Sequence, residues 1–181
     1  MSIKRILLIG AVTCALLTAA QPSTATAQAT HRSHDVAAAR AATARFHNIA
    51  TATRAGYELL TDAAGIACIE EPGMGGMGIH YVKPALVADP SIHLRRPEAL
   101  VYQPDKHGTL HLVALEYVVI AADWDATHSE PPSLFDHTFD FTPSPNRFGL
   151  PPFYSLHAWV WKHNPAGTFA MWNPRVHCLA G

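Results

Sequence analysis

The sequence predicts an α+β domain, in which an N-terminal helix packs on a curved, mainly antiparallel sheet or partial barrel closed by one disulfide. Three observations support this fold class. A helical repeat of small and apolar residues spans residues 35–55, a β-hairpin pattern spans residues 99–120, and two cysteines remain once the N-terminal segment is set aside.

The N-terminal segment has the pattern of an export signal. Lys4 and Arg5 precede an apolar run from Ile6 to Ala19 that is too short for a membrane span, and small residues follow at positions 27–29. We therefore predict a signal peptide over residues 1–29 and a single globular domain over residues 30–181. Its expected location is periplasmic or secreted.

The cysteines of the predicted domain form an even pair. Cys14 lies inside the apolar run and is removed with the signal peptide, which leaves Cys68 and Cys178. Export places the chain in an oxidising compartment, so these two residues are expected to form a disulfide. Because the closed loop is so long, the bond is worth on the order of 4 kcal/mol in the chain-entropy picture.

Charge and composition limit the possible partners. The signal segment holds two of the 13 Lys and Arg residues and none of the 14 Asp and Glu residues, so the predicted domain has a net charge of −3. This argues against nucleic acid and against an anionic membrane surface as partners. All 12 histidines lie in the predicted domain, which favours metal binding or acid–base chemistry.

A glycine-rich segment precedes the first histidine of interest. Gly75, Gly76 and Gly78 come just before His80, with no Lys-Ser or Lys-Thr ending that would indicate a phosphate loop. We interpret residues 75–79 as a loop that presents His80 to a pocket.

The hairpin contains a carboxylate in an apolar setting. Strands are expected over residues 99–103 and 110–120, joined by the turn chemistry of residues 104–108. Both faces of the second strand are apolar, so this strand should be central and covered on both sides. Glu116 then needs a partner, because an unpaired buried carboxylate costs several kcal/mol.

A third candidate element runs from Tyr154 to His163. If this segment is one strand, His157, Trp159 and Trp161 share a face. His163 lies roughly 20 Å further along the strand, too far from His157 to share one ion.

Three polar side chains from these elements are expected to meet. His80, Glu116 and His157 form an accepted ligand set for a divalent metal such as zinc or copper. Two alternatives use the same region. Glu116 and His157 can act as a metal-free catalytic acid–base pair on a small molecule, or Trp159, Trp161 and Tyr117 can form an aromatic groove for a small ligand without catalysis. Packing of these side chains in an ordinary core is the remaining possibility.

Three motifs resemble those of a family of small exported proteins of unassigned function. They are Gly-Gly-Met-Gly-Ile-His-Tyr at 75–81, Leu-Glu-Tyr-Val-Val at 115–119, and Leu-Pro-Pro-Phe-Tyr-Ser-Leu-His-Ala-Trp-Val-Trp-Lys at 150–162. The resemblance implies a single exported domain and assigns no catalytic residue.

Overall fold

A computed structural model describes residues 24–178 of the chain. Most of the predicted signal peptide lies outside these residues, and positions 24–29 begin the first helix. The elements, in chain order, are α1 (Thr24–Thr43), the 3-10 helix η1 (Ala44–His47), α2 (Ile49–Arg54), β1 (Glu58–Leu59), β2 (Cys68–Glu71), β3 (Gly75–Val82), α3 (Pro84–Val87), β4 (Ala99–Pro104), β5 (Leu110–Ile120), α4 (Ala121–Asp125), β6 (Ser133–Leu134), β7 (His137–Thr138), β8 (Asp140–Thr142) and β9 (Phe153–Ala158).

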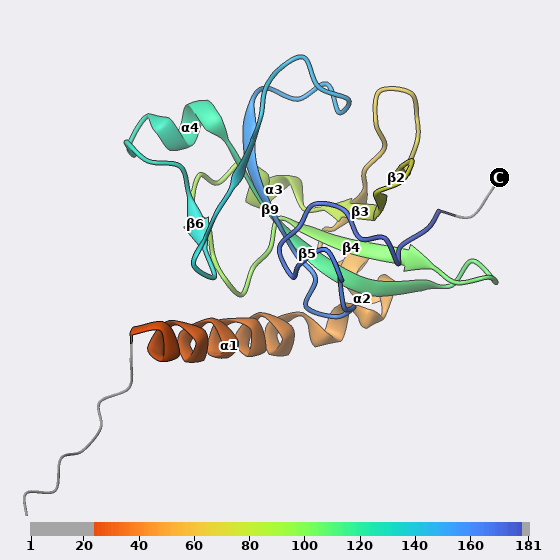
Figure 1. The fold of residues 1–181 in the computed structure, drawn as a ribbon. Coiled ribbons are helices and arrows are strands. Elements are labelled where there is room, and N and C mark those ends of the chain that lie inside the picture. The colour runs from red at the N-terminus through yellow and green to blue at the C-terminus, as the bar shows by residue number, and fades with distance from the viewer. Residues whose placement is uncertain (1–23, 179–181) are drawn as a thin grey trace, which may run out of the picture.

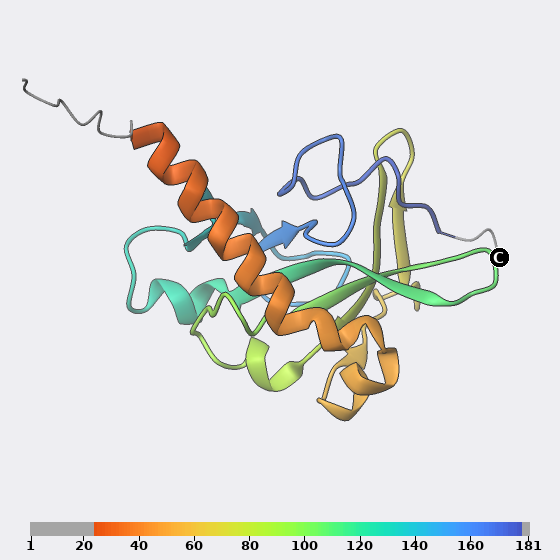
Figure 2. The ribbon, with the colours of Figure 1, turned by 90° about the horizontal axis from the view of Figure 1, so that it is seen from below.

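The predicted fold class is confirmed. Seven strands form one antiparallel sheet in the order β1-β3-β4-β5-β9-β8, with β2 paired to β3, and the sheet is not closed into a barrel. Strand β5 lies at its centre and is almost wholly buried. Helix α1 crosses one face of the sheet, whereas the loop of residues 143–152 lies on the other side (Figures 1 and 2).

The predicted helix over residues 35–55 is wrong in its limits and continuity. Helical structure already begins at Thr24 and is interrupted before α2, where the Asn48 side chain accepts a hydrogen bond from the Thr51 amide at 3.3 Å. An asparagine in this position satisfies an amide that has no partner inside the helix, so it starts a new helix. The break lets Phe46 and Ala52 both reach the core beneath the sheet.

Strand β5 contains a β-bulge that alters which of its residues face the core on the helix side. Pairing between β4 and β5 shifts by one residue between Val101 and Tyr102, so that Leu112 faces the same side as Leu115 and Tyr117. A β-bulge of this kind reverses the side on which later residues of a strand lie. Glu116 lies between Leu115 and Tyr117, which both face the helix side, so it faces away from helix α1.

The predicted loop over residues 75–79 is wrong, because residues 75–82 form strand β3. A Cβ atom on Gly75 would lie 2.2 Å from the Asn173 carbonyl oxygen, and one on Gly76 would lie 2.8 Å from the Val176 side chain. Glycine is required here because the C-terminal segment crosses directly over the strand and pairs with it at Gly76 and Asn173.

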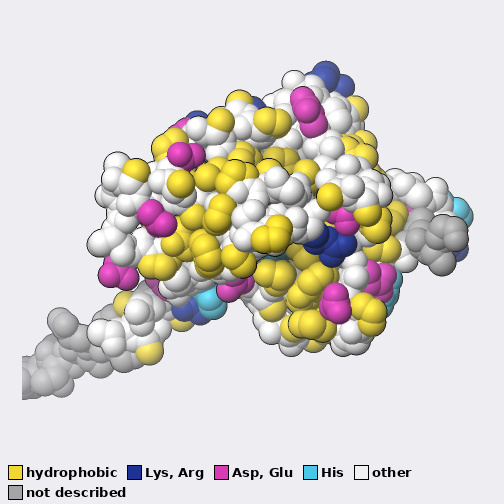
Figure 3. All heavy atoms as spheres, turned by 90° about the horizontal axis from the view of Figure 1, so that it is seen from above, with side chains coloured by type: hydrophobic (Ala, Val, Ile, Leu, Met, Phe, Trp, Pro, Cys, Tyr) yellow, Lys and Arg dark blue, Asp and Glu magenta, His cyan; other side chains and the backbone are white. Residues whose placement is uncertain are grey.

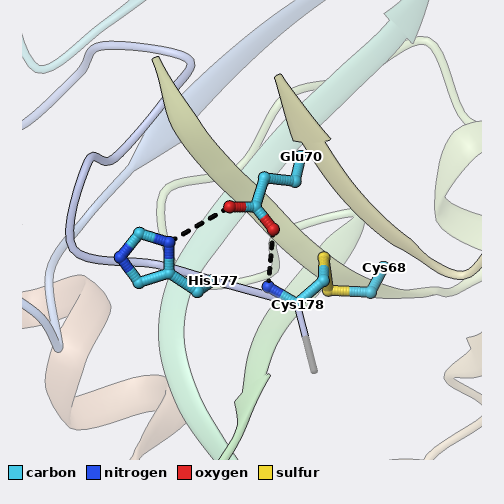
Figure 4. Close-up of a disulfide and its surroundings, with 4 residues drawn as sticks. All are labelled: Cys68, Glu70, His177 and Cys178. Atoms are coloured by element: carbon cyan, nitrogen blue, oxygen red, sulfur yellow. Dashed lines mark hydrogen bonds and ion pairs between the residues drawn. A yellow bond between two sulfur atoms is a disulfide. The ribbon is translucent and has the colours of Figure 1, made fainter. Parts of the chain in front are cut away.

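The C-terminal segment is fastened to the sheet by the predicted disulfide. Cys68 on β2 is bonded to Cys178, 110 residues later in the chain. Beside the disulfide, the Glu70 carboxylate accepts a hydrogen bond from the Cys178 amide at 2.9 Å and pairs with the His177 ring at 3.1 Å (Figure 4). These contacts hold the segment that passes over Gly75 and Gly76.

Candidate functional site

The three predicted site residues His80, Glu116 and His157 lie together on the sheet face opposite α1. His157 on β9 is the direct cross-strand partner of Glu116 on β5, and side chains of such a pair point to the same face. His80 lies on β3, two strands away from β5, and pairs with Val101 of the intervening strand β4. The metal-ligating atoms of all three residues lie within 4.8 Å of one another.

The contacts within this cluster are close. The Nε2 atoms of His80 and His157 are 3.2 Å apart, and His80 Nε2 is 3.3 Å from Glu116 Oε2. On the other side of the carboxylate, Glu116 Oε1 is 3.5 Å from His157 Nδ1. Both imidazoles thus direct nitrogen atoms at the same carboxyl group and at each other.

Burial determines the charge of the cluster. The two histidines are 2% exposed and Glu116 is 8% exposed. Burial lowers the pKa of His80 to about 4, partly opposed by Glu116, and burial also lowers the pKa of His157 to about 4. It raises the pKa of Glu116, against the opposing effects of His80 and a hydrogen bond from Ser155. At neutral pH both imidazoles are therefore uncharged and can donate lone pairs.

The cluster suits a metal ion in its donor set and its spacing. Zinc–nitrogen bonds of about 2.0–2.1 Å in a tetrahedral arrangement separate two ligand atoms by about 3.3–3.4 Å. The separations of 3.2 Å and 3.3 Å around His80 Nε2 are close to this value. Two uncharged imidazoles and one carboxylate also leave a fourth position for a further ligand, as catalytic zinc sites do.

Two cavities reach Glu116, and Phe148 and Phe153 line both of them. One, of about 310 Å³, is here named the apolar pocket; its lining residues are Glu58, Leu59, Leu60, His80, Val82, Pro84, Val87, Glu116, Val118, Phe148, Leu150 and Phe153. The second, of about 240 Å³, is lined by Met77, Glu116, Thr142, Asn146, Arg147, Phe148, Phe153, Ser155, Met171 and Trp172. Hydrophobic side chains gather over this face of the molecule, which Figure 3 shows from the side opposite α1.

The loop of residues 143–152 positions Phe148, which lines both cavities. Arg147 pairs with Asp62 at 2.9 Å, and the Arg147 carbonyl oxygen accepts a hydrogen bond from the Ala63 amide at 2.8 Å. Phe148 follows directly, and its ring centroid is 6.4 Å from that of Phe153. No signal within the loop indicates this position, because its partner at residues 60–66 is distant in sequence.

The three residues of the predicted aromatic groove lie apart, with Trp159 in one core cluster and Trp161 and Tyr117 in another. Strand β9 ends at Ala158, so the strict alternation predicted through His163 stops there. Trp159 stays beside His157, with ring centroids 6.2 Å apart, but it does not line either cavity that reaches Glu116. Trp161 instead packs on the helix side, where its Nε1 donates to Thr43 at 3.3 Å, and Tyr117 lies in the same helix-side core and donates to the Leu94 carbonyl oxygen.

Several residues of the site were absent from the sequence-based prediction. Phe148, Phe153 and Ser155 surround the carboxylate, and Ser155 could have been found from its period-two spacing with His157. Phe153 begins the same strand β9, whereas Phe148 comes from a loop whose position depends on the complete fold. Comparison with protein-family models, curated proteins and solved structures gives no match for this chain.

No helix within residues 24–178 combines the length and hydrophobicity needed to cross a membrane. The disulfide between Cys68 and Cys178 is compatible with an oxidising, extracellular environment.

Proposed function

We propose that this protein is an exported domain that binds one divalent metal ion, zinc or copper, through His80, Glu116 and His157. The observation that carries the proposal is the convergence of three buried donor groups, with His80 Nε2 at 3.2 Å from His157 and 3.3 Å from Glu116. Burying these three side chains together without a cation costs free energy, because the Glu116 carboxyl group must either ionise in an apolar setting or take up a proton. A divalent ion removes this cost.

The metal-free acid–base alternative has weaker support. A catalytic base works best when its pKa lies near the working pH, whereas burial lowers the pKa of His157 to about 4. The contact of 3.5 Å between His157 Nδ1 and Glu116 is also long for a hydrogen bond that orients a catalytic imidazole. Metal binding uses the same uncharged imidazoles directly.

The experiment is a metal analysis of protein expressed with its own signal segment and purified without a histidine tag. We expect about one equivalent of metal per chain, from the content of the isolated protein or after titration with zinc or copper. Glu116→Gln and His157→Ala should each lower the affinity by at least tenfold, because the first removes the negative charge of the carboxylate and the second removes an imidazole ligand. His111→Ala is the matched control, since His111 is exposed and pairs with Asp105 on the surface.

Stoichiometric binding that persists in both site variants with unchanged affinity would contradict the proposal. So would wild-type protein that binds neither ion when its correctly folded state is confirmed by circular dichroism.

A further inference from the structure

The apolar pocket beside the proposed metal site has the composition of a ligand site. Nine of its 12 lining residues are hydrophobic, and its polar groups are Glu58, His80 and Glu116. Its volume of about 310 Å³ is at the small end of ordinary ligand pockets. His80 and Glu116 lie at its inner end, where they are buried, whereas Glu58 is exposed to solvent.

The charge of a loaded site selects the kind of molecule that fits. A divalent cation together with ionised Glu116 and two uncharged imidazoles leaves a net charge of +1 in an apolar surrounding. The lining of the pocket contains no other carboxylate that is buried, and Glu58 is screened by water. A buried unpaired positive charge is unfavourable, so a singly charged anion at the fourth position is favoured over an uncharged group.

We infer that the apolar pocket binds a small monocarboxylate with an apolar body, whose carboxylate coordinates the metal while the body contacts Val82, Val87 and Leu150. This inference rests on the proposed metal site, because without the cation Glu116 disfavours a second buried carboxylate. The second cavity is a poorer location, since it is smaller and its lining does not include His80.

The test uses acetate, octanoate and 1-octanol as probes, with zinc-loaded and metal-free protein compared by isothermal titration calorimetry. Each buried methylene contributes about fourfold in affinity, so we expect zinc-loaded protein to bind octanoate at least thirtyfold more tightly than acetate. It should also prefer octanoate to 1-octanol by at least tenfold. In metal-free protein the preference should reverse, with 1-octanol bound more tightly than octanoate.

A variant with a filled pocket tests the location of the tail. Val87 is half-buried on α3 and lines the pocket, whereas Ala85 on the same helix is exposed and does not. Val87→Trp should lower octanoate affinity at least tenfold while acetate and zinc binding stay unchanged, and Ala85→Trp should behave as wild type. The comparison of acetate with octanoate on wild-type protein remains decisive if Val87→Trp does not fold.

Different experimental results would overturn carboxylate binding in the apolar pocket and metal binding by His80, Glu116 and His157. Zinc binding with equal affinities for acetate and octanoate, or with the same octanoate affinity in Val87→Trp, would overturn only the inference. Octanoate binding that does not depend on zinc would also overturn it. Absence of zinc and copper binding would overturn the proposed function.

Discussion

Glu98 provides a sharp prediction about stability, because it is a buried carboxyl group outside the proposed ligand set. Its side chain is 1% exposed and accepts a hydrogen bond from the Val118 amide at 3.0 Å. Burial raises the pKa of Glu98 to about 8, partly opposed by that amide. Glutamine has the same shape and can accept the same hydrogen bond, so Glu98→Gln removes the titration with little change in packing.

The direction in which stability changes with pH follows from the raised pKa of Glu98 in the folded state. The group favours folding fully below its ordinary pKa of 4.5, and this contribution is lost as the pH rises through about 8. At about 1.4 kcal/mol per pKa unit, the raised pKa of Glu98 lowers the free energy of unfolding by about 3 kcal/mol at pH 7 and about 5 kcal/mol well above pH 8. The free energy of unfolding of Glu98→Gln minus that of wild type should therefore increase by about 3 kcal/mol between pH 5 and pH 8.

Urea denaturation of both proteins at pH 5, 6, 7 and 8, with a chelator present to remove metal, measures this difference. Glu130→Gln is the control, because the Glu130 side chain is exposed to solvent. Its profile should stay parallel to that of wild type over this pH range. Parallel profiles for Glu98→Gln and wild type would refute the reasoning, since they would mean that Glu98 titrates normally in the folded protein.

Four further predictions concern the metal site and its support. Metal at a hundredfold excess over its dissociation constant should stabilise the wild type by about 2.7 kcal/mol and raise its melting temperature by about 5–10 °C, and most of this increase should be lost in Glu116→Gln. Because burial raises the pKa of Glu116, metal affinity should increase with pH, and calorimetry in buffers of different ionisation enthalpy should detect a released proton. Arg147→Gln breaks the contact with Asp62 that holds the loop over the site, so a chelator should remove metal several-fold faster while the stoichiometry stays the same. Replacing Cys68 and Cys178 by serine should lower the free energy of unfolding by about 4 kcal/mol in urea titrations; an unchanged midpoint would contradict this.

The elements that were predictable from sequence are those whose signals are local. The hairpin appears as β4 and β5 because a turn-forming segment separates two runs of strand-forming residues. The buried partner expected for Glu116 also exists, since a carboxylate among aliphatic residues requires one wherever the strand lies. His157 could be assigned to that partnership because the predicted alternation of side chains holds up to Ala158, where β9 ends.

The errors arise where distant segments decide the local conformation. Residues 75–79 look like a loop by composition, yet Gly75 and Gly76 are glycines because the C-terminal segment crosses over them within a strand. Likewise, the pattern from Tyr154 to His163 continues beyond Ala158, but Trp161 turns to the helix side and packs against Thr43. Neither contact has a signal within the segment concerned.

The convergence of His80 and Glu116 depends on the strand between them. Their strands are separated by β4, which places their backbones about 10 Å apart, since neighbouring strands lie about 4.8 Å apart. The residue of β4 opposite Glu116 is Ala99, which is fully buried and has a side chain of one carbon atom. Because a paired residue points to the same face, a larger side chain at Ala99 would occupy the space across which the two polar side chains meet. A small residue in a neighbouring strand is thus as necessary for the site as its three ligands, and its importance becomes visible only when the pairing of all four strands is known.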